Sequence, residues 1–398
     1  MDLSDPDLYA LGDPHGLFAE LRRRPGLYWN EEHDGPGFWA LTRHADALAA
    51  YRDTARLTST RGILLGPDRH AVDPAAGRML VMTDPPRHTR LRGILNRAFT
   101  PRMVARMQES LQAAVEELVG RALAAGRCDF VNDVAALVPV TMINEMMGVP
   151  RSDWSLMQEL TRVAFGSADR AYQLSPSERL SKGSAHTQIL AYHSRLLADR
   201  RREPGEDLVS VLATAEIDGR RLSDHEILLD CDNLIVGGNE TTRHAAAGGM
   251  LALVENAGQW SALREDPTLV DSAVEEILRW TSPAVHIMRT VTREHTIGGQ
   301  TVRPGEQVVI WNLSANRDEA AFREPQAFLV RRSPNRHLTF GMGEHFCIGA
   351  ALARMELRIL LTDLLARVDR VELDGPAERL RSNVVSGFKR LPVVLHPR

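Results

Sequence analysis

A cysteine inside a glycine-rich loop is the feature that most constrains this chain. The stretch FGMGEHFCIG runs from Phe340 to Gly349, and its Cys347 is one of three cysteines among 398 residues. Glycines permit backbone conformations that other residues avoid, and the apolar spacing of residues 350–368 predicts a helix directly after the loop. A helix N-terminus stabilises a thiolate, and backbone amides directed at sulfur suit a thiolate that binds a metal. The alternative interpretation is a structural cysteine that packs like a small apolar residue.

The neighbours of Cys347 limit the chemistry that it can serve. A zinc site would need a second cysteine close by, and the sequence has none there. A cysteine nucleophile would need a paired histidine, and nothing in the sequence shows that His345 faces the sulfur. Haem iron needs only one thiolate from the protein, because the porphyrin supplies the equatorial ligands. The loop therefore favours a haem site.

The composition argues against nucleic-acid and membrane partners. Hydrophobic residues make up 43% of the chain, which is enough for a sizeable core. The net charge is −4, so no strongly basic surface is expected. The sequence shows no basic leader and no apolar run long enough to span a membrane. Three widely separated cysteines fit a reducing compartment better than a disulfide framework. We therefore expect a soluble, cytoplasmic protein.

Hydrophobic patterning predicts a mainly α-helical fold with a small β portion. Helices are predicted over 103–126, over 223–256 with a Ser223–Glu226 capping box, and over 268–280 with a similar Thr268–Asp271 cap. Strands are predicted over 37–42 and 390–396, with a hairpin of two turns over 297–311. The polar stretch 167–184 predicts a loop. No linker divides the chain, so we expect residues 1–398 to form a single domain.

The loop as a whole resembles the haem-binding loop of the cytochrome P-450 family. The match is Phe340-x-x-Gly343-x-His345-x-Cys347-x-Gly349, which is a specific pattern. The resemblance implies that Cys347 is the axial ligand of haem b and that Gly349 belongs to the same cofactor loop. It also implies that Phe340 packs on the proximal side and that His345 faces a haem propionate.

A Glu-x-x-Arg motif, Glu276 and Arg279, precedes the loop in the order expected for the family. Residues three apart share a helix face and can pair, although a solvated surface pair is the ordinary interpretation. Glu275 can pair with Arg279 equally well. The resemblance implies that Glu276 and Arg279 stabilise the core behind the haem.

The stretch VGGNETTR, residues 236–243, lies in the middle of the longest predicted helix. Two glycines inside a helix cost about 1 kcal/mol each relative to alanine, so they need a reason. Close helix packing is one reason. The family resemblance gives another: Gly238 lets the helix approach the haem, Thr241 hydrogen-bonds oxygen there, and Glu240 helps relay protons.

Further haem contacts are implied at two other places. His88 and Arg92 stand four residues apart on a predicted helix and together suit an anionic partner, although a basic helix surface has the same pattern. The resemblance assigns both to a haem propionate, and it assigns Arg289 to a matching contact from a strand.

The resemblance, which covers nearly the whole chain, implies a monooxygenase that inserts one oxygen atom from O2 into a C–H bond. No dinucleotide fingerprint is present, so electrons from NAD(P)H are expected through a separate ferredoxin and ferredoxin reductase. The expected substrate is hydrophobic or is an amino acid tethered to a peptidyl carrier protein and β-hydroxylated in secondary metabolism. The alternative is a steroid, branched lipid or terpenoid. A non-hydroxylating or non-catalytic member stays open, and the family suggests a monomer.

The resemblance also implies the residues of an apolar substrate pocket. For the first three of them, ordinary core packing is the competing interpretation. The expected pocket residues are Ile63, Leu64, Leu65, Phe165, Val236, Val285, Val384 and Val385.

Overall fold

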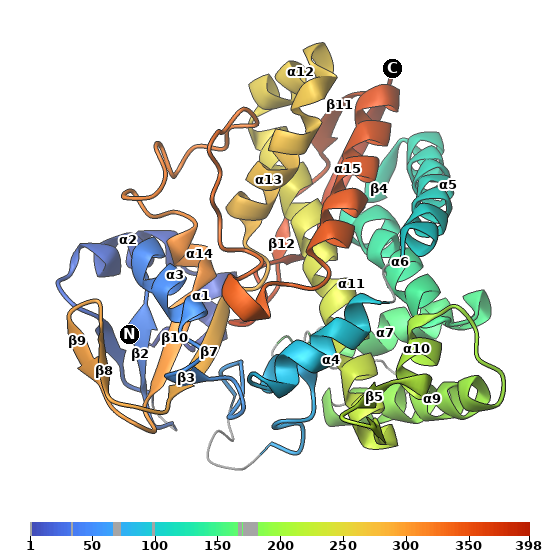
Figure 1. Ribbon diagram of the computed structural model, residues 1–398. Coiled ribbons are helices and arrows are strands. Elements are labelled where there is room, and N and C mark those ends of the chain that lie inside the picture. The colour runs from blue at the N-terminus through green and yellow to red at the C-terminus, as the bar shows by residue number, and fades with distance from the viewer. Residues whose placement is uncertain (1, 33–34, 67–72, 98–99, 166–168, 170–181) are drawn as a thin grey trace.

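The computed structural model describes residues 2–32, 35–66, 73–97, 100–165, 169 and 182–398. It has a helical part and a part built on a mixed sheet (Figure 1). This agrees with the mainly helical fold predicted from sequence. The predicted loop at 167–184 lies almost entirely outside the described residues. None of the helices in the described part of the chain combines the length and hydropathy needed to cross a membrane.

The sheet joins segments from the two halves of the sequence. Its order is β1-β2-β10-β7-β3, with β10 parallel to β2 and every other pair antiparallel. The strands are β1 (Tyr28–Asn30), β2 (Phe38–Leu41), β3 (Leu57–Thr58), β7 (His286–Val291) and β10 (Gln307–Trp311). Short helices cover it: α1 (Pro6–Ala10), α2 (Pro14–Arg23), α3 (His44–Arg52) and α14 (Asn312–Ala315).

Strand β10 shows why this sheet has a core on both faces. Successive side chains of a strand point to opposite faces. Val308 and Ile310 belong to the apolar cluster on one face, whereas Val309 and Trp311 belong to the cluster on the other. The predicted hairpin over 297–311 is confirmed only at its first turn, between β8 (His295–Ile297) and β9 (Gln300–Val302). Strand β10 pairs instead with β7 and β2, because apolar residues on both faces favour the middle of a larger sheet.

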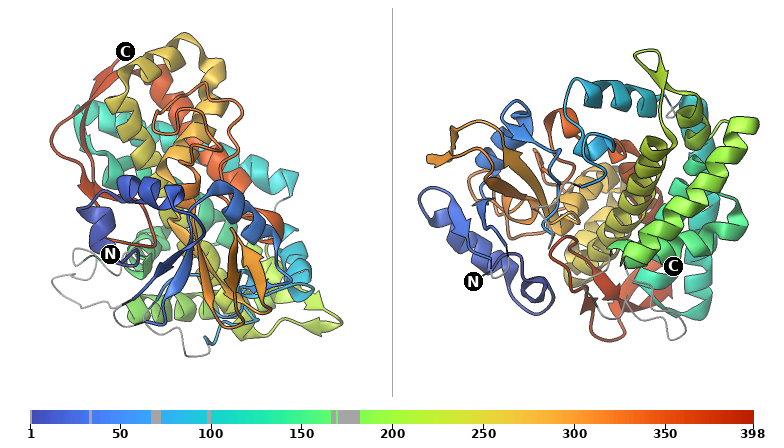
Figure 2. Two further views of the ribbon diagram at one scale, coloured as in Figure 1. Left: turned by 90° about the vertical axis from the view of Figure 1, so that its left-hand side faces the viewer. Right: turned by 90° about the horizontal axis from the view of Figure 1, so that it is seen from below.

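The helical part surrounds one long helix, α11 (Asp224–Glu255). The predicted capping box is confirmed, since the Ser223 and Glu226 side chains bond each other's backbone N–H. Helices α6, α7, α9, α13 and α15 all contact α11, and Figure 2 shows them around it from two further sides. The remaining helices of this part are α4 (Arg87–Asn96), α5 (Pro101–Ala125), α6 (Leu137–Met147), α7 (Trp154–Phe165), α9 (Lys182–Arg202), α10 (Leu208–Thr214), α12 (Ala257–Glu265), α13 (Val270–Thr281) and α15 (Ala350–Arg367).

The start of α13 differs from the prediction. The helix begins at Val270, after a 3-10 turn over Pro267–Leu269, and no side chain caps it. The Thr268 hydroxyl donates to Asp266 instead of pairing with Asp271, because Asp266 already caps the 3-10 turn. The predicted Thr268–Asp271 cap was therefore wrong: the side-chain cap belongs to Asp266 and the preceding 3-10 turn, and α13 itself has none.

Short strands and turns complete the fold. The predicted strand at 390–396 is confirmed as most of β14, which pairs with β11 and β4. The short strands are β4 (Arg127–Asp129), β5 (Glu216–Ile217), β6 (Arg220–Arg221), β11 (Val368–Leu373), β12 (Glu378–Arg379), β13 (Phe388–Arg390) and β14 (Pro392–Pro397). The 3-10 turns are η1 (Leu80–Met82), η3 (Arg151–Asp153), η4 (Pro267–Leu269) and η5 (Gly343–His345), and η2 (Phe130–Ala135) is a short π-helix.

Candidate functional site

The cysteine loop reaches its position through glycines. Gly343 has φ +74°, and a Cβ on it would lie 2.9 Å from the backbone oxygen of Tyr51 on α3. Only glycine allows this conformation and this close approach without strain. The Cys347 backbone N–H donates to the Phe340 oxygen at 2.9 Å, which closes the loop just before α15. The loop is thereby fixed between the sheet part and the helical part.

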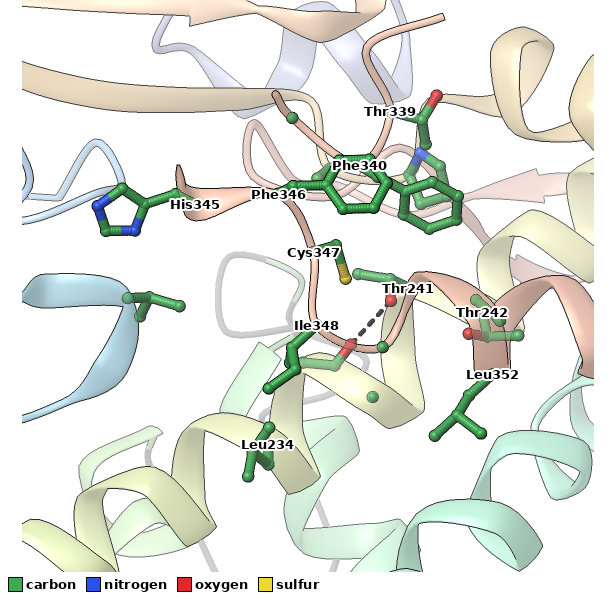
Figure 3. Close-up of a pocket in the computed structure, with 18 of the residues that line it drawn as sticks. Leu234, Thr241, Thr242, Thr339, Phe340, His345, Phe346, Cys347, Ile348 and Leu352 are labelled. Atoms are coloured by element: carbon green, nitrogen blue, oxygen red, sulfur yellow. Dashed lines mark hydrogen bonds between the residues drawn. The ribbon is translucent and has the colours of Figure 1, made fainter. Parts of the chain in front are cut away.

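The Cys347 side chain lies deep in the protein but is accessible, because it faces a pocket (Figure 3). Burial raises the pKa of the Cys347 thiol, and the Gly349 N–H, Arg92 and Arg354 oppose that rise. Helix α15 begins at Ala350, so its N-terminus stands next to the sulfur. The chain thus supplies a backbone donor and two cations to any negative charge on this sulfur.

The pocket walls are mainly apolar. They come from η1, α11, α13, β7, the Cys347 loop and α15. Phe340 is part of this wall, and the Arg354 guanidinium lies over its ring, 4.6 Å from the ring centre. Other apolar lining residues include Leu80, Val81, Leu234, Leu278, Ile287, Ile348 and Leu352.

One end of the pocket gathers the four predicted propionate contacts, His88, Arg92, Arg289 and His345. Arg289 is 5% exposed and forms no ion pair with a residue that the structure describes. A buried guanidinium without a carboxylate is costly, so this end favours an anionic ligand. Burial lowers the pKa of Arg289.

The two histidines at this end are neutral at physiological pH. Their rings lie 4.1 Å apart, and burial lowers the pKa of His88 to about 4 and that of His345 to about 3. The His88 Nδ1 is buried without a hydrogen-bond partner among the described residues. Neutral imidazoles beside two arginines provide hydrogen-bond donors without adding repulsion.

Gly237 and Gly238 of α11 differ in what surrounds them. A Cβ on Gly237 would meet nothing within 4 Å, whereas a Cβ on Gly238 would lie 3.1 Å from Ile143 Cδ1 of α6. Both line the pocket. Gly238 therefore also has the close-packing role that the sequence left open. The Thr241 hydroxyl faces the same space as Cys347 and donates to the Gly237 oxygen at 2.7 Å (Figure 3).

Glu240 lies beside Thr241 in sequence but does not line the pocket. The residue is 3% exposed, and its carboxylate lies 3.3 Å from Arg243 and 3.4 Å from His244. Burial alone raises the pKa of Glu240, but Arg243 and His244 outweigh burial and hold that pKa below its usual value. The Glu240 carboxylate is therefore ionised. Arg243 and His244, one turn further along α11, hold it away from the pocket.

Glu276 and Arg279 form a fully buried pair in place of the ordinary surface pair. Two guanidinium nitrogens bind the two carboxylate oxygens at 2.8 Å. Arg332, which the sequence analysis missed, adds a third bond to Glu276 at 2.9 Å. Glu275 pairs instead with Arg354. Arg332 lies 53 residues beyond Arg279 (332 − 279), so helical spacing gave no signal for it.

Most of the expected substrate-pocket residues lie elsewhere. Ile63 lines the pocket, whereas Leu64 is half-buried outside it. The other described residues do not line the pocket and are packed into apolar clusters instead. The Phe165 side chain lies outside what the structure describes. The clustered residues are Leu65, Val236, Val285, Val384 and Val385.

Several lining residues were missed by the sequence analysis. Asn233 stands four residues before Gly237 and eight before Thr241, so helical spacing alone could have found it. Glu356 of α15, Tyr51 of α3 and Asn312 of α14 reach the pocket through tertiary packing, which leaves no local signal.

These residues fit a flat, mostly apolar group that carries a metal and anionic arms. The sulfur of Cys347 can bind the metal, the apolar walls can hold the ring, and the buried cationic end can bind carboxylates. Haem has each of these properties. No cluster of protein metal ligands competes for the role among the described residues.

Comparison with known proteins identifies the family. The Cytochrome P450 family model matches residues 9–384. Putative cytochrome P450 126 of Mycobacterium tuberculosis is 40% identical, over 99% of this chain and 97% of its own length. The crystal structure of P450 OxyD, which is involved in the biosynthesis of vancomycin-type antibiotics, is 40% identical with a TM-score of 0.91 over 100% of both chains.

A third similar protein was solved with a protein partner. P450BioI, in complex with an acyl carrier protein ligated to hexadec-9Z-enoic acid, is 28% identical to this chain. Its TM-score is 0.85, and the match covers 96% of this chain and 99% of that one. The family implies haem whose iron is held by a thiolate. The chain belongs to the cytochrome P450 family and is a haem-thiolate monooxygenase.

Proposed function

We propose that this enzyme hydroxylates a C–H bond of a hydrophobic substrate presented on a carrier protein, with Cys347 as the thiolate ligand of haem. The observation that carries the haem assignment is the accessible Cys347 sulfur, which faces Thr241 across a pocket with a buried cationic end. His88, Arg92, Arg289 and His345 would bind the propionates. When bound, haem with a thiolate ligand activates dioxygen by favouring cleavage of the O–O bond.

The chain's own residues would control protons and water at the reacting centre. Thr241 presents its hydroxyl to the pocket, and its bond to the Gly237 oxygen fixes the side chain. A hydroxyl held in this way presents its acceptor lone pairs to the pocket, so it can accept a hydrogen bond there, and it can donate its own proton to the pocket only after it releases the Gly237 oxygen. Glu240 would replenish that proton, but only after its carboxylate moves away from Arg243 and His244. The apolar walls exclude bulk water from the substrate.

The thiolate assignment is tested by absorption spectroscopy. Purified, reduced protein saturated with carbon monoxide should show the strongly red-shifted Soret band of a thiolate-bound haem. Cys347→Ala should lose this band, whereas Cys128→Ala, which changes a half-buried cysteine on β4, should keep it. Haem-loaded wild type without the band would overturn the assignment.

The carrier-bound substrate is proposed from the likeness to P450BioI, which was solved with a ligated acyl carrier protein. Likeness to OxyD adds a link to antibiotic biosynthesis. The specific form is β-hydroxylation of an amino acid on a peptidyl carrier protein. Tight binding of an aminoacyl carrier protein, with none of the free amino acid, would support it. Binding of a free terpenoid, steroid or branched lipid, with no binding of the aminoacyl carrier protein, would favour the second candidate, which the mainly apolar walls also suit.

Electrons are proposed to come from NAD(P)H through a ferredoxin and its reductase. Arginines next to the cysteine loop, such as Arg354 and Arg358 of α15, would dock the acidic ferredoxin. Both already pair with carboxylates of α13, so Arg52, for which the structure gives no ion pair with a described residue, is the sharper test. Arg52→Glu should slow reduction by ferredoxin without changing reduction by dithionite. Equal rates with ferredoxin would contradict this docking face.

A further inference from the structure

Asn233 is a polar lining residue whose chemistry the proposed function leaves unused. It lies on α11, is half-buried and borders the pocket. Its amide makes no hydrogen bond to a residue that the structure describes. Both acidic residues just before it have a hydrogen-bond partner: Asp232 bonds His186, and one oxygen of Asp230 accepts from the Leu80 N–H at 2.7 Å.

Three of the other polar lining side chains are already committed to hydrogen bonds. Thr241 donates to Gly237, and Asn312 donates to the Ala284 oxygen while it accepts from Tyr51. The arginines and histidines gather at the cationic end. Around Asn233 the wall is apolar, with Leu80, Val81 and Leu234 also lining the pocket.

The position of Asn233 on α11 sets its distance from Thr241. Asn233, Gly237 and Thr241 are spaced by four residues and so lie along one face of the helix. A rise of about 1.5 Å per residue places Asn233 about 12 Å from Thr241 along the helix axis. A ligand group at Asn233 is therefore about two helical turns from a carbon that faces Thr241.

An uncharged amide in an apolar wall selects a particular kind of ligand group. It both donates and accepts, so it can bind a hydroxyl, a carbonyl or an amide. It offers no charge to balance a carboxylate or an ammonium group, whose desolvation in this wall would be costly. Asn233 therefore favours a neutral polar group over a charged one and over a plain hydrocarbon.

We infer that Asn233 is a specificity-determining residue that binds a neutral hydrogen-bonding group on an otherwise apolar substrate. The substrate would be held with its oxidised carbon near Thr241, about two helical turns away. This inference rests on the proposed function and narrows its substrate class. Both proposed substrate types contain such a group, for example the amide of a tethered amino acid or the hydroxyl of a terpenoid.

The test uses matched ligand pairs and the haem-loaded protein. Each pair is one apolar skeleton with and without a single neutral group: a terpenoid alcohol, a steroid ketone and an N-acyl amino acid amide, each against its deoxy or des-amide partner. Dissociation constants come from the change in the haem absorption spectrum on binding. In wild type at least one polar member should bind more tightly than its partner.

Asn233→Leu should weaken binding of that polar member about five- to tenfold, as expected for one lost hydrogen bond, and leave its partner unchanged or tighter. Asn233→Ser should retain part of the preference. An equal loss for both members, an unchanged preference in Asn233→Leu, or no preference in wild type would each overturn the inference. The reduced carbon monoxide spectrum of the same samples separates this failure from failure of the haem-thiolate assignment, because Asn233→Leu should keep the red-shifted band.

Discussion

At the scale of single residues, two adjacent threonines of α11 allow a matched comparison. Both line the pocket, but only Thr241 faces Cys347 with its hydroxyl held by the Gly237 oxygen. If Thr241 passes protons, Thr241→Val should keep NAD(P)H consumption while a much larger share of the electrons appears as hydrogen peroxide. Thr242→Val should change that share little. Peroxide yields can be measured alongside product, and equal yields for the two variants would exclude a special role for Thr241.

A second residue-scale prediction concerns the buried pair of Glu240 and Arg243. Removing one partner from a buried ion pair costs roughly 3–5 kcal/mol, because the other charge is left uncompensated. Arg243→Met should therefore lower the free energy of unfolding by about that amount, as measured by urea denaturation. Adding Glu240→Gln to Arg243→Met should restore part of the loss. A double variant no more stable than Arg243→Met would contradict the pairing.

The sequence was informative about residues whose neighbours along the chain set their position. Cys347, Gly349, Thr241 and the Glu276–Arg279 pair depend on a loop or on helical spacing, and the structure places each where a local pattern would place it. Val236 and Leu65 are apolar like true lining residues. Only tertiary packing turns their side chains into the core, and composition cannot report that direction.

At the scale of elements, the packing of α11 on α13 depends on glycine. A Cβ on Gly249 would lie 2.7 Å from Ile277 Cγ2, closer than side-chain atoms tolerate. Gly249→Ala should destabilise the protein by about 1–3 kcal/mol through overpacking, despite the better helix propensity of alanine. In an Ile277→Ala background the same change should cost little, because the space is already free.

The control for that prediction is a glycine without neighbours. A Cβ on Gly258, exposed on α12, would meet nothing within 4 Å, so Gly258→Ala should leave the unfolding midpoint unchanged or slightly raised. Equal destabilisation by Gly249→Ala and Gly258→Ala would show that backbone conformation, and not the contact with Ile277, sets the cost.

Element boundaries were predictable where capping and periodicity agree. Helix α11 has both signals and begins where predicted, at its capping box. Helix α13 has a strong apolar period but an ambiguous start, because Pro267 and Asp266 favour a 3-10 turn first. The partners of β10 were not predictable, since the apolar residues of that strand fit a hairpin or a central strand equally well until the rest of the sheet is known.

At the scale of the whole molecule, the candidate site exists only because distant segments meet. The cationic end draws on α4, β7 and the cysteine loop, and other parts of the wall draw on α11 and η1. The sheet itself joins residues 28–58 to residues 286–311. Sequence motifs could name the contributors but not the wall between them, which is why lining residues such as Tyr51 and Glu356 emerged only from the fold.

Glu356 makes the stability of the whole molecule depend on pH. The residue is 4% exposed, and one of its carboxyl oxygens is buried with no partner among the described residues. Burial raises the pKa of Glu356 from 4.5 to about 8, so the folded state keeps a proton that the unfolded state loses. The contribution of this group to stability is thus fully present below pH 4.5 and is lost as the pH rises through about 8.

Urea denaturation of the haem-loaded protein between pH 5 and pH 8 should therefore show the wild type losing stability relative to Glu356→Gln, because glutamine has no proton to release. The difference between the two proteins should change with a slope approaching about 1.4 kcal/mol per pH unit within this window and level off above it. Other titrating groups are common to both proteins and cancel in the difference. Parallel stability curves would mean that Glu356 is ionised in the folded protein, and that a cation or an ordered water in the pocket balances its charge.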